Sequence, residues 1–487
     1  MIRAMVIRRQ LALFAHKWPR ALHAGAVLLS ALFLCWPAIF NGFPLLYPDS
    51  MTYLGDGPVV ARAVILRQFA EYYGVRSFFY SLGILPFHWN VTAWPVAWLQ
   101  CLLVAWVVWL LVRAIAGRRS AARYLILMFL LSLLTSVSWY CSFIMPDILG
   151  PLAYLSFFLL VFARQTLTRA ERWGLYLLAW WGITSHASHF LLAAGVWLLL
   201  TMIAACDWKS FPGRLWSLGE LAAILALAAG AQMALHGYLY GKPTLNGERP
   251  PYLMARIISD GPGRWYLEKH CDKGQWAVCD RFRQLSDNPD DLLWGPESAY
   301  DSGSEEDEDR QIREEMPFVL ATVQAYPREQ FFKSAANFRD QLVAFGPYGF
   351  DPSPWILGQF DTVLPASRAS YVRSRQARST LPLDELADIQ MWALWAALGI
   401  IAVGAVLLWR RHWPGLGVLG LMIVSVVAAN ALVTGVLSVV DDRYQCRVIW
   451  LIPLLAGLLL LDWLHQWETA KAASKIKATQ EQVAVLA

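Results

Sequence analysis

Residues 21–40 read ALHAGAVLLSALFLCWPAIF, and residues 41–53 continue as NGFPLLYPDSMTY. The first stretch carries no Asp, Glu, Lys or Arg, and it matches the roughly 20 apolar residues of a bilayer-spanning helix. The second stretch contains Tyr47-Pro48-Asp49, which places a carboxylate where the chain leaves the bilayer. A charged group beside a membrane span is costly to desolvate and is therefore often functional. A solvated turn is the other interpretation, because Pro, Asp and Ser favour turns.

The composition is typical of a membrane protein. Of the 487 residues, 57% are hydrophobic, only 16% are charged and 25 are Trp. These values exclude an ordinary soluble domain and a disordered chain. Because several apolar runs reach the length of a bilayer span, we expect an all-α polytopic membrane protein. The first run lacks a small-residue cleavage site before Asn41, so we interpret it as a retained anchor.

Basic residues predict the direction of each crossing, because Lys and Arg are concentrated in cytoplasmic loops. Placing every basic short loop in the cytoplasm gives about ten crossings, with both ends of the chain cytoplasmic. The expected spans are 21–40, 91–115, 124–143, 148–163, two within 173–205, 216–236, 392–409, 416–440 and 449–464. The basic residues used are Arg3, Arg8, Arg9, Lys17, Arg20, Arg113, Arg118, Arg119, Arg123, Arg164, Arg169, Arg172, Lys209, Arg214, Arg410 and Arg411.

Two segments do not fit a single ordinary span. As one helix, residues 173–205 would be about 50 Å long, which exceeds one crossing. We expect two short helices there, with His186 and His189 at the outer apex. Residues 55–89 are aromatic with scattered charges, and short helices lying in the membrane interface are expected.

The expected domain organisation has four parts. Residues 1–236 form a transmembrane module with the first outer loop, 237–388 a mixed but mostly helical periplasmic domain, 389–466 the last transmembrane helices, and 467–487 a cytoplasmic tail. The acidic run 305–309 is expected to be a solvated loop.

The cysteines predict no zinc site. Cys271 and Cys279 share a polar loop that contains no further Cys, so these two residues could form a local disulfide if the loop faces an oxidising compartment. Four others lie in or beside apolar runs and are expected to pack as small hydrophobes: Cys35, Cys101, Cys141 and Cys206.

This topology places acids and imidazoles at the outer ends of several helices, so we expect a shared cavity beneath the outer domain. A carboxylate there suits a general base, and an arginine suits a phosphate. Asp49 and Asp147 are also the candidates to share Mg²⁺ or Mn²⁺. The residues concerned are Asp49, Asp56, Asp147, His186, His189, Asp441, Asp442 and Arg443.

The donor of such a reaction is expected to be lipid-linked. No phosphate-cradling Gly-rich loop or nucleotide fingerprint is present, and no nucleic-acid partner is expected. The segment 368–378 is unusually basic for an outer segment, and either contacts lipid headgroups or binds the donor phosphate.

These motifs resemble those of the GT-C superfamily of glycosyltransferases that use polyprenyl-phosphate sugars, such as protein mannosyltransferase-like and aminoarabinose-transferase-like enzymes. The similar features are Tyr47-Pro48-Asp49, Arg76-Ser77-Phe78-Phe79-Tyr80, Met145-Pro146-Asp147 and Asp442-Arg443-Tyr444. The resemblance covers roughly the first 240 and the last 100 residues. It departs from the superfamily because Asp49 is followed by Ser50 and not by a second acid.

The resemblance implies roles for individual residues. Asp49 would be the catalytic base and Asp147 a second acid that supports it or a metal, while Arg443 would contact the donor phosphate. The remaining substrate-binding candidates are Tyr444, Asp442, His186, His189, Tyr47 and Arg76.

The expected activity is transfer of a sugar from a polyprenyl-phosphate donor to a glycan, lipid or protein acceptor. It would occur with inversion at the periplasmic face of a bacterial inner membrane, in contact with membrane lipids. Three alternatives stay open: a transporter or flippase of a lipid-linked or anionic substrate, a membrane acyltransferase that uses the His pair, and a non-catalytic partner in cell-envelope polysaccharide assembly.

Overall fold

The computed structural model describes residues 19–70, 76–116, 121–206, 214–247, 249–409 and 414–486. Within these ranges the chain is helical without a named β-strand, and one isolated bridge joins Leu45 to Phe143. The all-α prediction is therefore confirmed. Some basic residues used for the topology lie outside the described ranges: Arg3, Arg8, Arg9, Lys17, Arg118, Arg119, Lys209, Arg410 and Arg411.

Among the described residues, six helices are long and apolar enough to cross a bilayer, which makes this a multi-pass helical membrane protein. They are α6 (Trp94–Ala116), α11 (Ala187–Cys206), α12 (Arg214–Tyr240), α20 (Leu383–Trp409), α21 (Pro414–Leu437) and α23 (Leu451–Leu486). Shorter helices complete the bundle: α2 (Pro19–Leu34), α7 (Ala121–Leu134), α9 (Leu149–Phe162) and α10 (Arg169–Thr184).

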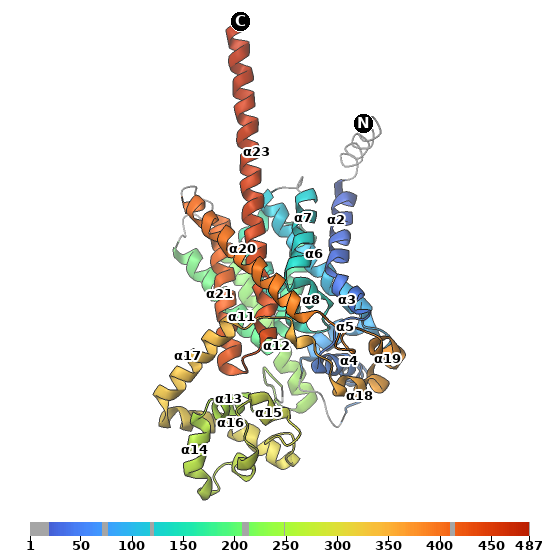
Figure 1. Cartoon of the computed structure of the whole chain (residues 1–487), viewed down its shortest axis with the longest axis vertical. Coiled ribbons are helices and arrows are strands. Elements are labelled where there is room, and N and C mark those ends of the chain that lie inside the picture. The colour runs from blue at the N-terminus through green and yellow to red at the C-terminus, as the bar shows by residue number, and fades with distance from the viewer. Residues whose placement is uncertain are drawn as a thin grey trace.

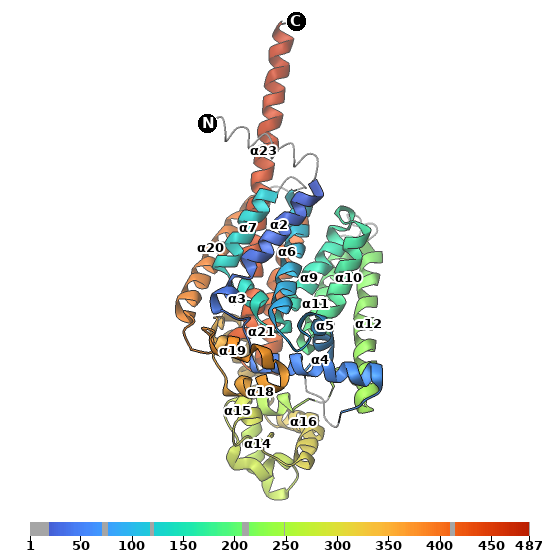
Figure 2. The ribbon, with the colours of Figure 1, turned by 90° about the vertical axis from the view of Figure 1, so that its right-hand side faces the viewer.

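These helices run roughly along one axis, as Figures 1 and 2 show. The start of α2 and the end of α23 lie at the same end of the bundle, and α23 extends well beyond it (Figure 1). The helices of residues 252–325 cover the opposite end. The tail that the sequence predicts to begin at residue 467 is thus a continuation of α23.

The segment 173–205 is divided as predicted. Helix α10 ends at Thr184, and α11 begins at Ala187. The hydroxyls of Thr184 and Ser185 donate to backbone carbonyls one turn earlier, including that of Trp181. Such local side-chain bonds compete with helix continuation. His186 lies in the connection, and His189 lies in the first turn of α11.

The chain between Trp36 and His88 forms three helices, of which the first begins within the predicted span 21–40. Helix α3 (Trp36–Asn41) ends at Gly42, whose φ of 83° suits glycine. Helix α4 (Pro48–Leu66) starts with Pro48, which is favoured at the first helical position. Figure 2 shows α4 lying across the bundle axis. Helix α5 (Phe78–His88) follows, so helices are present between residues 55 and 89 as expected. Their position in the membrane interface stays a prediction.

Residues 252–325 form a compact unit, here called the α13–α16 unit. Its apolar core is separate from that of the bundle and is built around Met254, Leu267, Trp276 and Phe318. Its elements are α13 (Tyr252–Ser259), α14 (Pro262–His270), η4 (Cys271–Lys273), η5 (Ala277–Gln284), α15 (Pro289–Trp294) and α16 (Glu305–Ala325).

The following helices pack on the bundle, and α17 also contacts this unit, where Gln330 and Asn337 donate hydrogen bonds to Asp260 at 2.8 and 2.9 Å. Helix α17 (Pro327–Val343) lies against α21, where a Cβ on Gly435 would be 2.7 Å from the Asn337 carbonyl oxygen. Helices α18 (Pro354–Val363) and α19 (Arg368–Val372), with η6 (Tyr348–Phe350) and η7 (Pro365–Ser367), contribute Phe360 and Tyr371 to the bundle core.

Two local expectations need correction. The acidic run 305–309 is not a loop but the start of α16, where Ser304 accepts a hydrogen bond from the Asp307 amide. Acidic side chains are favourable at a helix N-terminus because of the helix dipole. Cys206 is exposed at the end of α11, whereas Cys35, Cys101 and Cys141 are buried as expected. Cys271 and Cys279 form a disulfide.

Candidate functional site

Asp49 lies in the first turn of α4, which begins at Pro48. The Ser50 hydroxyl oxygen caps this helix by accepting a hydrogen bond from the Tyr47 amide. Its Oδ1 accepts a hydrogen bond of 2.7 Å from Arg76 Nη2, and its side chain is 16% exposed. Within the described residues no hydrogen bond is made to Oδ2. The carboxylate is therefore oriented by one arginine and keeps one oxygen for a ligand.

Arg76 links this carboxylate to the α13–α16 unit. Its Nη1 donates to Tyr252 Oη at 3.0 Å, and its Cζ lies 6.0 Å from the centre of the Trp294 ring. Tyr252 begins α13, and Trp294 ends α15. The unit thus contacts the first outer loop directly.

Arg443 lies in α22 (Asp442–Ile449), which starts where Asp441 accepts a hydrogen bond from the Arg443 amide at 2.7 Å. Its guanidinium lies against two aromatic rings, with Cζ 4.2 Å from Tyr47 and 4.9 Å from Tyr444. The residue is only 7% exposed, yet its Nε and Nη1 have no hydrogen-bond partner in the described protein. Buried N–H groups are almost always paired, so two unpaired ones indicate a place for an anionic ligand.

Asp147 lies in the single turn η1 (Pro146–Ile148) and is 3% exposed. Its Oδ1 is 3.6 Å from Nη1 of Arg447, which lies one turn after Arg443 on α22. Arg447 is fixed by Asn430, whose Oδ1 accepts from Nε at 2.9 Å and Nη2 at 2.7 Å, and by Ser188 Oγ at 3.1 Å. Asp147 therefore faces a fully buried arginine.

Backbone hydrogen bonds join the loops that carry the two acids. The Leu45 amide donates to the Ser142 carbonyl at 2.9 Å, and the Ile144 amide donates to the Leu45 carbonyl at 3.0 Å. Residues 45 and 143 thus form a bridge between the first outer loop and the chain just before Asp147.

The predicted residues from separate loops meet at one end of the bundle. Four charged groups interact electrostatically with the phenol of the buried Tyr53: Asp49, Arg76, Asp147 and Arg443. These four and Arg447 are called the charged cluster below.

His186 and His189 adjoin the charged cluster but differ in exposure. His186 is partly exposed, and its Nδ1 forms a hydrogen bond of 2.8 Å with Ser188 Oγ. Its imidazole interacts electrostatically with Arg447, Arg443 and Arg76. His189 is 1% exposed, and its Nδ1 is 2.9 Å from the Gly182 carbonyl oxygen. His189 thus joins α11 to α10 and interacts electrostatically with Arg447, whereas His186 interacts with three arginines of the cluster.

Other predicted residues contribute indirectly. Asp442 interacts electrostatically with Asp441 and Tyr348, and no interaction with the charged cluster is seen among the described residues. In the basic segment, Arg375 packs on the Phe40 ring at 4.3 Å. Gln376 exchanges two hydrogen bonds with the Leu46 backbone. This segment therefore holds the first outer loop in place.

Asp290 is a neighbour that the sequence does not indicate. It lies in the first turn of α15, and its pKa is above the ordinary range of aspartate. The largest cause is desolvation by the surrounding protein, followed by the negative charge of Asp441, while Arg443 opposes the shift. The interactions also include Asp49 and Arg76, so the α13–α16 unit presents a carboxylate to the charged cluster.

A divalent cation would meet competition at the two predicted ligands. Asp49 is paired with Arg76 and Asp147 with Arg447. In the part of the chain that the structure describes, no group of three or more His, Cys, Asp or Glu side chains is arranged to hold a metal. The role of a metal stays a prediction.

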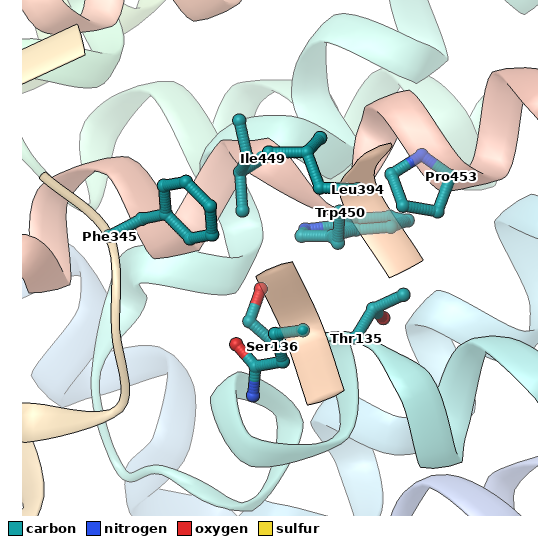
Figure 3. A pocket seen from close by; sticks show the side chains of 8 residues that line it. Thr135, Ser136, Phe345, Leu394, Ile449, Trp450 and Pro453 are labelled. Carbon is teal, nitrogen blue, oxygen red and sulfur yellow. The ribbon is translucent and has the colours of Figure 1, made fainter. Parts of the chain in front are cut away.

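One nearby hollow is too small for a substrate. It has a volume of about 10 Å³ and lies between α22, α23, α20 and the turn at Thr135 and Ser136 (Figure 3). Gln390 also lines it and has a buried Oε1 without a hydrogen-bond partner. Such a space holds at most one water molecule.

Comparisons of the chain with models of protein families, with curated proteins and with solved structures found no match.

Proposed function

We propose that this protein is an integral-membrane glycosyltransferase that moves a sugar from a polyprenyl-phosphate donor to an acceptor hydroxyl. The proposal includes ten crossings of a bacterial inner membrane, made by the six long helices together with α2, α7, α9 and α10. Both ends of the chain would be cytoplasmic, and the charged cluster would lie at the periplasmic face beneath the α13–α16 unit. The family proposed is the GT-C superfamily.

The observation that carries this proposal is that Nε and Nη1 of Arg443 are buried without a hydrogen-bond partner among the described residues. Burying a charge without a partner is costly, so such a group is expected to be retained for its ligand. Unpaired guanidinium N–H groups suit a phosphate, because they make strong charge-assisted hydrogen bonds to its oxygens. Tyr47 and Tyr444 flank the site with apolar surface, which suits the first part of a lipid attached to that phosphate.

Asp49 would serve as the base. Its free Oδ2 would accept the proton of the acceptor hydroxyl as the hydroxyl oxygen attacks the anomeric carbon of the donor. The bond between that carbon and the phosphate oxygen breaks, and its electron pair leaves with the polyprenyl phosphate. Arg443 would stabilise the negative charge that develops on the departing phosphate. A single displacement of this kind inverts the anomeric configuration.

Acyl transfer by the histidine pair is less well supported. A general base must reach its substrate proton, whereas His189 is buried, with its Nδ1 at the Gly182 carbonyl and Gly150 beside its Nε2. His186 is more accessible and stays a candidate for substrate binding.

The test uses purified full-length protein in detergent with a panel of polyprenyl-phosphate sugars and acceptor glycans. We expect release of free polyprenyl phosphate from one donor, and a loss of about 10²- to 10⁴-fold in Asp49→Asn. The matched control is Asp287→Asn, because the Asp287 side chain is 88% exposed in the α13–α16 unit. Normal turnover by Asp49→Asn would remove the assignment of the base, and no release from any donor would remove the proposed activity.

A further inference from the structure

A second hollow lies between α10 and α12, away from the charged cluster. Its volume is about 570 Å³, within the usual range for a small-molecule site. The end of α10 at Thr184 contacts the first outer loop through a 2.7 Å bond from Ser77 Oγ. Since α10 has 16 residues and rises about 24 Å, its start at Arg169 lies at the opposite end of the bundle.

One arginine that lines this hollow is paired with a carboxylate. Arg164 bonds Glu220 through both guanidinium nitrogens, with Nη2 to Oε1 at 2.9 Å, and Tyr176 donates to the same carboxylate. Trp216 Nε1 also donates to Glu220, at 2.9 Å. The charge of Arg164 is thus neutralised, and this group stabilises the contact between α10 and α12.

Two further arginines line the hollow without a carboxylate. Arg169 and Arg172 lie in the first turn of α10, and neither forms an ion pair within the described ranges of the chain. The Nε of Arg172 is buried without a hydrogen-bond partner. The nearby acid Glu171 is already bonded twice to Arg113, at 2.6 and 2.7 Å. The hollow therefore holds an excess of two positive charges at its mouth.

The remaining wall is apolar and open to the side of the bundle. Trp173 is 73% exposed, and Leu177 and Leu227 are each 65% exposed. Trp180 lines the hollow further along α10. Figure 2 shows α10 and α12 at the edge of the bundle. In a membrane protein such a face meets lipid chains.

We propose that this hollow binds one anionic phospholipid, such as phosphatidylglycerol. Arg169 and Arg172 would hold the phosphate, and the acyl chains would lie along Trp180, Leu177 and Leu227. Basic pockets between membrane helices are suited to anionic headgroups, and guanidinium groups bind phosphate through two parallel hydrogen bonds. This site is independent of the proposed glycosyl transfer.

The test measures lipid binding to the delipidated full-length protein in detergent by native mass spectrometry. Phosphatidylglycerol and phosphatidylcholine with the same acyl chains are compared. We expect wild-type protein to prefer phosphatidylglycerol, and the double variant R169Q/R172Q to bind it about thirtyfold more weakly. The charge-matched control R313Q/R328Q removes two exposed arginines of α16 and α17 and should bind like wild type.

Two further arms separate a lipid site from a simple phosphate site. Ala223→Trp fills the apolar part of the hollow from an exposed position on α12, and it should weaken phosphatidylglycerol binding with both arginines intact. Inorganic phosphate at the same concentration should not displace the lipid. Equal binding of both lipids, unchanged binding by R169Q/R172Q, or displacement by inorganic phosphate would each overturn the proposal.

Discussion

Replacing either arginine of α22 by Met should have opposite effects on the free energy of unfolding. Arg443 and Arg447 are one helical turn apart and both are nearly inaccessible, at 7% and 1% exposure. Arg447 is hydrogen-bonded to Asn430 and Ser188 and faces Asp147. Arg443 has two unpaired N–H groups and contacts only aromatic rings with its guanidinium within the described residues.

The magnitudes follow from these contacts. Arg447→Met leaves Asp147 as a buried charge without its partner, which costs about 3–5 kcal/mol. Arg443→Met removes two unsatisfied donors, each of which lowers the free energy of unfolding by about 1–3 kcal/mol. It also removes two cation–π contacts, each of which raises the free energy of unfolding by about 0.5–2 kcal/mol. We therefore expect the free energy of unfolding to fall in Arg447→Met and to stay equal or rise by about 1 kcal/mol in Arg443→Met.

Arg443 should contribute to donor binding although it does not contribute to stability. Two charge-assisted hydrogen bonds to a phosphate contribute about 1.5–3 kcal/mol each, so Arg443→Met should weaken donor binding by about 10² to 10⁴-fold. Stability is measured by equilibrium unfolding in mixed detergent micelles without donor, and binding by titration with the polyprenyl-phosphate sugar. A loss of 3 kcal/mol or more in Arg443→Met without donor would show that Arg443 is structural and would refute the reasoning.

Two further predictions concern the α13–α16 unit and the bundle. The raised pKa of Asp290 means that its charge opposes folding at neutral pH, so Asp290→Asn should raise the free energy of unfolding at pH 7. That gain should disappear as the pH falls through the ordinary aspartate pKa of about 4, and a gain that persists at pH 3 would contradict the assignment. Gly182→Ala places a Cβ 2.6 Å from the Leu149 carbonyl oxygen and should cost about 1–3 kcal/mol, as measured by the same unfolding assay. Gly195→Ala on α11 meets no atom within 4 Å and should stabilise the helix by up to about 1 kcal/mol; equal effects of the two alanines would contradict the packing argument.

The helical class and the division at His186 follow from patterns that are local in the sequence. Apolar run length indicates a span, and a run that is too long for one crossing must be divided. The acids at positions 49 and 147 were singled out because each lies where an apolar run ends. Their proximity to Arg443 depends on contacts between loops that are far apart in the chain.

Other features could not be read from the sequence for a physical reason. Arg447 lies four residues after Arg443, the spacing that places two side chains on one helix face, but its partners Asn430 and Ser188 come from other helices. Asp290 belongs to a unit with its own core, and only packing shows that it faces Arg443. The start of α16 is not predicted from the sequence, because an acidic run is typical of a solvated loop and also of a helix N-terminus.

The bridge between Leu45 and Phe143 has a consequence for the energetics of catalysis in the proposed enzyme. A loop that rearranges when substrate arrives must spend part of the binding energy on ordering its backbone. Here two main-chain hydrogen bonds already tie the segments that carry Asp49 and Asp147. Their carboxylates are preorganised, so the reorganisation energy of the site is low before any sugar enters.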